Sequence, residues 1–241
     1  MTVYFIGAGP GDPELITVRG QRLIRNCATI LYAGSLVPVA VLEGHRAERV
    51  VDTADLHLDE IIGLIAQAHA QGHDIARVHS GDPALFGAIG EQIRRLKPLR
   101  IPYEIVPGVT ATAACAALLG VELTLPDVAQ TLILTRYGGK TALPPGEQLH
   151  DLARHRATLA IHLGVPHLRN IVQELLPSYG ADCPIAVVHR ASWPDQDVVQ
   201  GTLADIEEKV AAKGFRRTAL ILVGRVLTAD DFADSTLYRA E

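Results

Sequence analysis

The chain has 241 residues, of which 48% are hydrophobic, and it carries a formal net charge of −5 with a pI of about 6.0. This composition supplies enough apolar side chains for a packed core and argues against broad disorder. It also lacks the surplus of basic residues that binding to nucleic acid requires, so we expect no nucleic-acid partner. The length fits one large domain or two smaller ones.

The cysteines and the apolar segments argue against disulfide-rich, zinc-binding, secreted and membrane-spanning proteins. Cys27, Cys115 and Cys183 are far apart and no CxxC pair occurs, so the sequence predicts neither a disulfide framework nor a zinc site. The first residues lack the basic start and the long apolar stretch of a signal peptide. No segment approaches the ~20 apolar residues that span a bilayer. We therefore expect a cytoplasmic protein without a membrane partner.

Short apolar runs alternate with amphipathic stretches along the first half of the chain. Apolar runs of this length indicate buried strands, and apolar residues at helical spacing indicate helices. The predicted strands are 3–6, 28–32, 49–52, 74–79 and 103–106, and the predicted helices are 17–25, 59–71, 87–96 and 110–119.

A second series follows a break at Leu125-Pro126-Asp127. Its predicted strands are 131–135, 158–162, 185–189, 198–202 and 219–223, and its predicted helices are 146–152, 167–176 and 203–212. The strand at 198–202 follows another strand without a helix between them, so we expect that pair to be antiparallel. Alternation of strands and helices is typical of α/β architecture. We predict two α/β domains, 1–126 and 129–241, with mixed, mostly parallel sheets flanked by helices.

Three glycine-proline loops each follow a predicted strand of the first half. They read Gly7-Ala8-Gly9-Pro10-Gly11-Asp12, Gly81-Asp82-Pro83-Ala84-Leu85-Phe86-Gly87, and Pro107-Gly108-Val109-Thr110-Ala111. Ligands of open α/β sheets lie outside the carboxyl ends of the strands. We therefore expect the three loops to line one crevice that binds a small molecule.

The first loop differs from a dinucleotide-binding fingerprint. Asp12 stands at the third glycine position, Pro10 removes a backbone donor, and the strand ending near Ala33 brings no carboxylate for a ribose. A nucleotide-dependent oxidoreductase is therefore disfavoured. The segment Gly138-Gly139-Lys140-Thr141 lacks the first glycine of a phosphate loop, since position 134 is leucine.

Other catalytic patterns are incomplete. His69 and His73 are four residues apart, but Ala70 breaks the HExxH pattern, and a surface pair without metal is the favoured interpretation. No GxSxG segment occurs. Asp82 is the most informative carboxylate: it fits either a ligand contact or an Asx turn to its own backbone.

Together the three loops resemble those of the tetrapyrrole methyltransferases of cobalamin and sirohaem synthesis. They occur in that family's order, and the resemblance covers essentially the whole chain. Further stretches look like its precorrin-4 C11-methyltransferase branch, namely residues 32–38 (YAGSLVP), 134–136 (LTR) and 188–196 (VHRASWPDQ). The cobalt-precorrin-4 enzymes of the anaerobic route look nearly the same there. Phe86 stands where the family often has tyrosine.

The resemblance implies the family's fold, with an active-site cleft between the two domains, and a homodimer. It implies transfer of a methyl group from S-adenosylmethionine to C11 of precorrin-4, giving precorrin-5 and S-adenosylhomocysteine in cobalamin biosynthesis. The alternatives are the cobalt-precorrin-4 reaction, a sister methylation at another carbon such as C2, C20 or C17, and a diphthine-synthase-like protein methyltransferase. A noncatalytic tetrapyrrole carrier is an alternative from another class.

Carried over by position, the resemblance implies cofactor contacts from both domains. These are Pro10, Gly81, Asp82, Leu85, Thr110 and Ala111 in the first domain, and Leu163, Ala186, Thr218 and Ala219 in the second. Leu85, Leu163 and Ala186 equally fit an ordinary core. The implied substrate is rich in carboxylates, which arginine and lysine match, so Arg136, Lys140 and Arg190 are its predicted binding residues; for Lys140 a solvated loop lysine is the favoured alternative.

No essential general base is expected, because an electron-rich ring carbon that attacks an activated methyl group needs little base assistance. The catalytic residues are therefore left unknown, and Asp82 and Arg136 are the best candidates for positioning. Alignment of the carbon with the S–CH3 bond can supply ~7–11 kcal/mol of the barrier.

Overall fold

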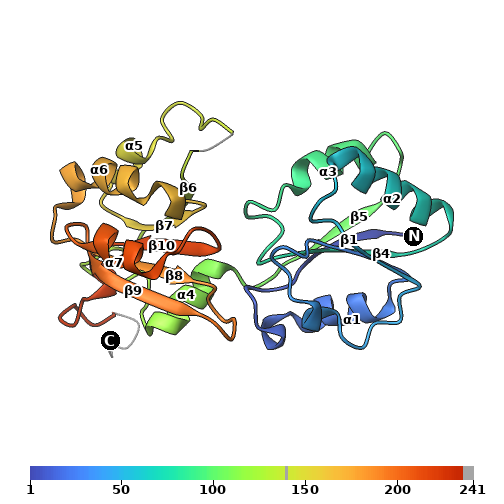
Figure 1. Cartoon of the computed structure of the whole chain (residues 1–241), viewed down its shortest axis with the longest axis horizontal. Helices are drawn as coiled ribbons and strands as arrows, with labels where there is room; N and C mark the ends of the chain where they lie inside the picture. Colours follow the sequence, from blue (N-terminus) through green and yellow to red (C-terminus); the bar gives the residue numbers. More distant parts are fainter. Residues whose placement is uncertain (139–140, 236–241) are drawn as a thin grey trace, which may run out of the picture. The chain divides into compact units, whose positions relative to one another are not determined.

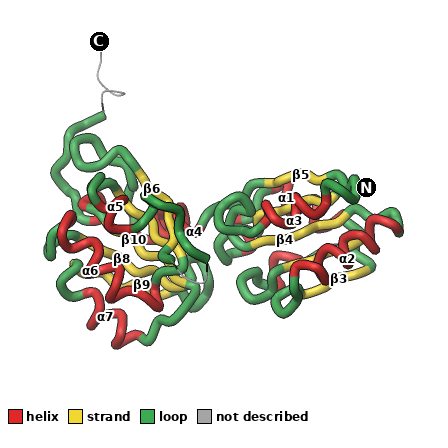
Figure 2. Tube along the Cα trace, turned by 90° about the horizontal axis from the view of Figure 1, so that it is seen from above, coloured by secondary structure: helices red, strands yellow, loops and turns green. Residues whose placement is uncertain are grey.

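The computed structural model describes residues 1–138 and 141–235. Contacts between Cα atoms divide the chain into two compact units, Met1–Ala111 and Thr112–Glu241, which we call unit 1 and unit 2. Each unit contains one sheet flanked by helices (Figures 1 and 2), as the sequence predicts.

Unit 1 is built on a five-stranded sheet in the order β3-β2-β4-β1-β5, in which each paired neighbour among the described residues is parallel. The strands are β1 (Val3–Gly7), β2 (Thr29–Tyr32), β3 (Arg49–Asp52), β4 (Ile75–His79) and β5 (Tyr103–Val106). The helices are α1 (Val18–Asn26), α2 (Leu58–Ala70) and α3 (Ile89–Leu96), with 3₁₀ turns η1 (Pro13–Leu15) and η2 (Val39–Leu42).

Helices cover both faces of this sheet because successive strand residues point to opposite sides. Phe5 packs in the cluster that contains residues of α2 and α3, whereas the next residue, Ile6, packs with residues of α1 and η2. Burial on both faces explains why the inner strands β1 and β2 read as nearly continuous apolar runs in the sequence.

Local signals set the helix ends in unit 1. Thr17 caps α1, its side chain accepting a hydrogen bond from the Gly20 amide at 3.1 Å. His57 and Glu60 form a capping box at the start of α2. Gly72 follows that helix with a φ of +86°, a conformation that glycine adopts without strain.

Unit 2 is built on a mixed sheet in the order β6-β7-β10-β8-β9. Its strands are β6 (Leu132–Arg136), β7 (Thr158–His162), β8 (Pro184–His189), β9 (Asp197–Thr202) and β10 (Ala219–Val223). Its helices are α4 (Ala111–Leu119), α5 (Leu149–Ala153), α6 (Leu168–Tyr179) and α7 (Ile206–Lys213), with 3₁₀ turns η3 (Val165–His167) and η4 (Arg225–Leu227). β6 and β7 are parallel, and the other neighbours are antiparallel, including the β8–β9 pair that the sequence predicts to be antiparallel.

The division between the units falls after the first residue of α4, whereas the sequence predicts it at residues 126–129. Ala114 and Cys115 of α4 pack in one cluster with Ala160, Leu220 and Leu222 of the second sheet. The break at Pro126 marks only a turn, in which the Leu125 amide donates to the Ala129 carbonyl at 2.8 Å. The apolar face of α4 therefore sets the division, and a sequence break does not.

Two of the helix ends that differ from the predictions have identifiable physical causes. α7 begins at Ile206 and not at residue 203, because the Asp205 carboxylate accepts from the Thr202 amide at 2.8 Å and forms a turn there. α6 continues beyond residue 176 through Pro177 to Tyr179. Tyr179 is buried and donates its hydroxyl to the Ala157 carbonyl, and this tertiary contact outweighs the helix-breaking effect of the proline.

In the described part of the chain no helix is long and apolar enough to cross a membrane.

Substitutions on α4 test the assignment of this helix to unit 2. Ala114→Leu places a large side chain against the second sheet and should destabilise unit 2 by about 1–3 kcal/mol. Trp193 is the chain's single tryptophan and lies in unit 2, so urea unfolding followed by its fluorescence reports on that unit. Ala117→Leu, on the exposed side of the same helix, should change the free energy of unfolding by less than about 0.5 kcal/mol. Equal effects of the two variants would contradict the packing.

Candidate functional site

The strand order brings the three glycine-proline loops together, as the sequence predicts. β1 lies between β4 and β5, and all three strands are parallel, so the loops that follow them leave the same carboxyl edge of the sheet. We call this the carboxyl edge of unit 1, formed by residues 7–12, 80–87 and 107–110. Edges of this kind, where connections diverge on either side of a central strand, bind the ligands of open α/β sheets.

Main-chain hydrogen bonds join the first two loops. The Gly9 amide donates to the Gly81 carbonyl at 3.3 Å, and the Gly81 amide donates to the Gly9 carbonyl at 2.7 Å. The Ala8 amide also donates to the His79 carbonyl at 2.8 Å, directly beyond the end of the β1–β4 ladder. The pairing of the two strands thus continues into the loops and fixes their backbones.

The third loop approaches the other two more closely than any side chain would allow. A Cβ atom built on Gly108 would lie 2.2 Å from the Gly81 carbonyl oxygen, and one built on Gly7 would lie 2.6 Å from the Gly108 Cα. Real Cβ atoms do not approach other atoms so closely, so both positions require glycine for space and not for φ.

The Asp82 carboxylate binds the backbone of two loops. Its Oδ1 accepts from the Ala84 amide at 2.8 Å, and its Oδ2 accepts from the Gly108 amide at 2.9 Å. The first bond is the Asx turn that the sequence left open as an alternative to a ligand contact. The second bond ties the second loop to the third, so the side chain positions this edge.

The other residues predicted at this edge lie on the same loops. Pro10 is buried, whereas Leu85, Thr110 and Ala111 are half-buried. Phe86 is 46% exposed and has a φ of +56°. Positive φ costs energy in a bulky residue and concentrates at functional sites.

Two buried basic side chains lie beneath the second loop on β4. The Arg77 guanidinium donates to the Gln92 side chain at 3.1 Å and to the Leu31 carbonyl at 3.2 Å, and burial lowers its pKa to about 10. His79 is also buried, and burial together with the charge of Arg77 lowers its pKa to about 3. Its Nε2 has no hydrogen-bond partner within the described residues. His79 is therefore neutral at physiological pH.

Unit 2 also carries positive φ values at the edge where β6, β7 and β8 end and β9 and β10 begin. We call it the loop edge of unit 2. Leu163, Arg190 and Thr218 stand there with φ values of +56°, +49° and +57°. The Arg190 amide donates to the Thr218 carbonyl at 2.9 Å, and Leu163 is 66% exposed. The structure thus brings three of the residues predicted for unit 2 to one edge.

Ala186 lies elsewhere. It is paired with Leu222 in the middle of β8 and is 1% exposed. Its burial matches the ordinary core position that the sequence left open as the alternative. Ala219, in contrast, begins β10 at the loop edge opposite His189.

The predicted basic residues of the loop edge already have contacts within the chain. Arg136 ends β6 and donates through Nη2 to the carbonyls of Thr141 and Ala142, at 3.0 and 3.3 Å. Arg190 pairs through Nε with Asp195 at 2.7 Å and stacks 3.9 Å from the centre of the Trp193 ring. Lys140 lies outside the described residues.

Sequence reasoning missed further polar residues of this edge. His162 ends β7, its Nε2 lies 3.3 Å from the Thr112 hydroxyl, and burial lowers its pKa to about 4. Arg216 and Arg217 are exposed immediately before Thr218. The sequence did contain a signal for these two arginines, because they directly precede Thr218, a predicted cofactor residue, just before a predicted strand.

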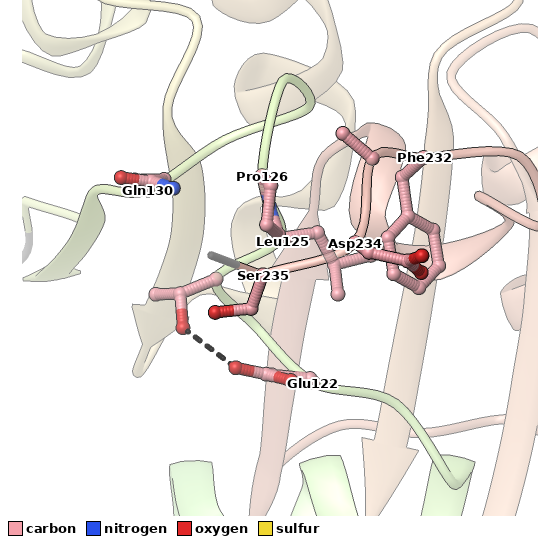
Figure 3. Close-up of a pocket in the computed structure, with 9 residues that line it drawn as sticks. Glu122, Leu125, Pro126, Gln130, Phe232, Asp234 and Ser235 are labelled. Atoms are coloured by element: carbon pink, nitrogen blue, oxygen red, sulfur yellow. Dashed lines mark hydrogen bonds between the residues drawn. The ribbon is translucent and has the colours of Figure 1, made fainter. Parts of the chain in front are cut away.

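A cavity of about 800 Å³ lies at the opposite edge of the second sheet (Figure 3). Its lining comes from the segment before β6 (Glu122, Leu125, Pro126 and Gln130 among others) and from residues 232–235. Within the described residues, no group of three His, Cys, Asp or Glu side chains could hold a metal ion. The residues that line the cavity belong to neither the carboxyl edge of unit 1 nor the loop edge of unit 2.

Comparison with known proteins shows the family of the chain. A profile of the tetrapyrrole (corrin/porphyrin) methylases matches residues 2–207. The chain belongs to this family, as the three loops predict.

Within the family, the chain is 76% identical to a precorrin-4 C(11)-methyltransferase of Pseudomonas aeruginosa, covering 100% of this chain and 96% of the relative. A cobalt-precorrin-4 C(11)-methyltransferase of Methanocaldococcus jannaschii is 48% identical, with 98% and 92% covered.

Two solved structures are similar. A cobalt precorrin-4 methyltransferase has a TM-score of 0.91 at 41% identity and covers 95% of this chain and 96% of its own. A uroporphyrin-III C-methyltransferase of Thermus thermophilus, in complex with S-adenosyl homocysteine, has a TM-score of 0.78 at 33% identity, with 95% and 94% covered.

Gly108→Ala should destabilise unit 1 by at least about 2 kcal/mol, because the added methyl group meets the Gly81 carbonyl. Gly63→Ala is the matched control. A Cβ at Gly63, inside α2, meets nothing within 4 Å, so this variant should be up to about 1 kcal/mol more stable than wild type. Thermal unfolding followed by circular dichroism gives both values, and a Gly108→Ala protein as stable as the control would refute the close approach.

His79 makes stability depend on pH in a defined window. The unfolded chain takes up a proton on this residue near its usual pKa of 6.5, whereas the folded chain resists protonation down to about pH 3. Through this group the free energy of unfolding should therefore fall as the pH drops through 6.5, by about 2 kcal/mol at pH 5, and should change by less than about 0.5 kcal/mol above pH 6.5.

Urea unfolding at pH 7 and pH 5 tests this dependence. His79→Gln should lose about 2 kcal/mol less between the two pH values than wild type does. His45→Gln, at an exposed histidine, should keep the wild-type loss. An unchanged loss in His79→Gln would show that the group does not titrate as its burial requires.

Proposed function

We propose that the chain is a methyltransferase that transfers a methyl group from S-adenosylmethionine to C11 of precorrin-4, giving precorrin-5 in cobalamin biosynthesis. The single observation that supports this most strongly is 76% identity over the full chain to a precorrin-4 C(11)-methyltransferase. The cobalt-precorrin-4 reaction is a second candidate, supported by the TM-score of 0.91 to an enzyme of that name.

The residues of both edges fit an adenosyl cofactor. The carboxyl edge of unit 1 is a cradle that the Cβ atoms of ordinary residues would fill, as Gly7 and Gly108 show. Such a backbone surface lets a flat ligand approach main-chain donors and acceptors directly. We place cofactor contacts at Pro10, Gly81, Asp82, Leu85, Thr110 and Ala111 in unit 1, and at Leu163, Thr218 and Ala219 in unit 2. Ala186 is buried in β8, so the contact proposed for it is through its backbone.

When bound, S-adenosylmethionine supplies a methyl group already activated on a cationic sulfur. The protein's task is then to orient the ring carbon and to exclude water. Asp82 acts by fixing the second and third loops, since both of its carboxylate oxygens accept backbone amides. No general base is required, and the buried neutral His79 and His162 are suited to shaping the site and not to accepting a proton at neutral pH.

Arg136 and Arg190 are the proposed partners of substrate carboxylates, together with Lys140. Each arginine uses part of its guanidinium inside the protein and retains further N–H donors, because the group carries five. Internal contacts of this kind hold the side chain in place before the substrate binds.

The family resemblance also supports a homodimeric, cytoplasmic enzyme. The net charge of −5 supports the absence of a nucleic-acid partner. Sedimentation equilibrium tests the dimer directly.

Incubation with precorrin-4 and methyl-labelled S-adenosylmethionine tests the activity. The product should gain one labelled methyl group, and NMR should place it at C11. Parallel incubation with cobalt-precorrin-4 separates the two candidates by their kcat/KM values. A methyl group at another ring carbon would assign a sister activity, and no transfer with tight tetrapyrrole binding would leave a carrier.

Arg136→Ala should raise the KM for the tetrapyrrole at least about tenfold and leave the Kd of S-adenosylhomocysteine within about twofold of wild type. The reason is the loss of charged donors to substrate carboxylates. Arg94→Ala, at an exposed arginine of α3, should leave both values unchanged. Equal losses in both constants would reject the role assigned to Arg136.

A further inference from the structure

The turn between α7 and β10 is a basic feature of the loop edge of unit 2. Arg216 and Arg217 occupy this turn immediately before Thr218 and are exposed. Neither forms a hydrogen bond or an ion pair with any residue in the described part of the chain.

Neighbouring cations of the same edge are paired. Lys213 binds Asp197 at 2.8 Å, and Arg190 binds Asp195 at 2.7 Å. The carboxylates at the start of β9 and in the β8–β9 loop are thus already neutralised. Arg216 and Arg217 therefore leave a local positive surplus on a chain whose net charge is −5.

The turn is anchored on both sides of the arginine pair. Phe215, directly before it, stacks on the His189 ring with the ring centres 4.7 Å apart and the planes at 15°. Thr218, directly after it, has a φ of +57° and accepts a hydrogen bond from the Arg190 amide at 2.9 Å. Two exposed charges on a fixed backbone lose less entropy on binding than charges on a loose loop.

We infer that Arg216 and Arg217 bind carboxylate side chains of the macrocyclic substrate and contribute to its selection. This inference rests on the proposed function, for which it names two further binding residues. The guanidinium group matches a carboxylate with two parallel N–H donors. Thr218 lies next to the pair and is a proposed cofactor contact, so carboxylates held there would lie close to the donor of the methyl group.

The double variant Arg216→Gln/Arg217→Gln tests the inference. Its KM for precorrin-4 should rise at least about tenfold, because two charged contacts are lost. Its kcat at saturating substrate and its Kd for S-adenosylhomocysteine should stay within about twofold of wild type, since neither arginine is proposed to touch the reacting atoms. Arg216→Lys/Arg217→Lys keeps both charges and should recover part of the loss.

Arg25→Gln/Arg46→Gln is the matched control. These two arginines are exposed in unit 1, and the substitution changes the net charge by the same amount. Its KM should equal that of wild type. A similar rise in the control would assign the effect to overall charge and overturn the inference.

A binding measurement separates the inference from the proposed function. Uroporphyrin III, a stable tetrapyrrole with carboxylate side chains, is titrated into each protein and followed by quenching of Trp193 in unit 2. Wild type and control should bind it with equal affinity and the Gln variant about tenfold more weakly, with a smaller dependence on salt.

The KM and binding measurements together distinguish a failure of the inference from a failure of the proposed function. Weaker uroporphyrin III binding by the Gln variant, with no methylated product from wild-type enzyme, would sustain the inference and sink the proposed function. Unchanged KM and unchanged binding in the Gln variant would overturn the inference alone. A loss of kcat or of S-adenosylhomocysteine binding as large as the rise in KM would show a merely structural role. Failure of wild type in both assays would overturn both proposals.

Discussion

Contact between backbones, without side chains between them, is the constraint on which unit 1 depends. Gly7, Gly81 and Gly108 come from three parallel strands, and their main-chain atoms meet where the strands end. Main-chain groups of the first two loops can then bond to each other and not to water. This contact gives the edge its shape. A fold that filled the same space with side chains would lose that shape.

The loops are also supported from below by buried polar groups. Arg77 is buried with only neutral hydrogen-bond partners, which is costly, because no carboxylate offsets the desolvation of its charge. Its donors to Gln92 and to the Leu31 carbonyl link β4 with α3 and β2. β4 is the strand that delivers the second glycine loop, so this internal contact holds the loop's point of departure. Polar groups of this kind favour one arrangement of the strands over alternatives.

Local sequence patterns predicted most elements, because strand and helix periodicities are properties of short segments. The β3 and β5 ranges agree residue for residue with those predicted, and the three loops fall at strand ends as expected. The patterns did not reveal that α4 packs on the second sheet, since an alanine-rich helix fits closely against either sheet. They also left the role of Asp82 open. Its bond to the Gly108 amide joins residues 26 positions apart, and no local rule predicts such a pair.

In the proposed function the two edges recognise ligands by different means, and this difference bears on how specificity arises. The edge of unit 1 is made of backbone, held by glycines and by Asp82, so few substitutions there preserve the surface while altering its preference. The edge of unit 2 instead displays side chains, namely Arg136 at the end of β6, Arg190 with its positive φ after β8, and Arg216 and Arg217 in the anchored turn before β10. A backbone surface such as that of unit 1 suits a cofactor that is common to many reactions. A side-chain surface such as that of unit 2 suits substrates that differ in the placement of their carboxylates, because exchanging one arginine changes a single contact without disturbing the fold. The choice of ring carbon is therefore expected to depend on unit 2 more than on the glycine loops.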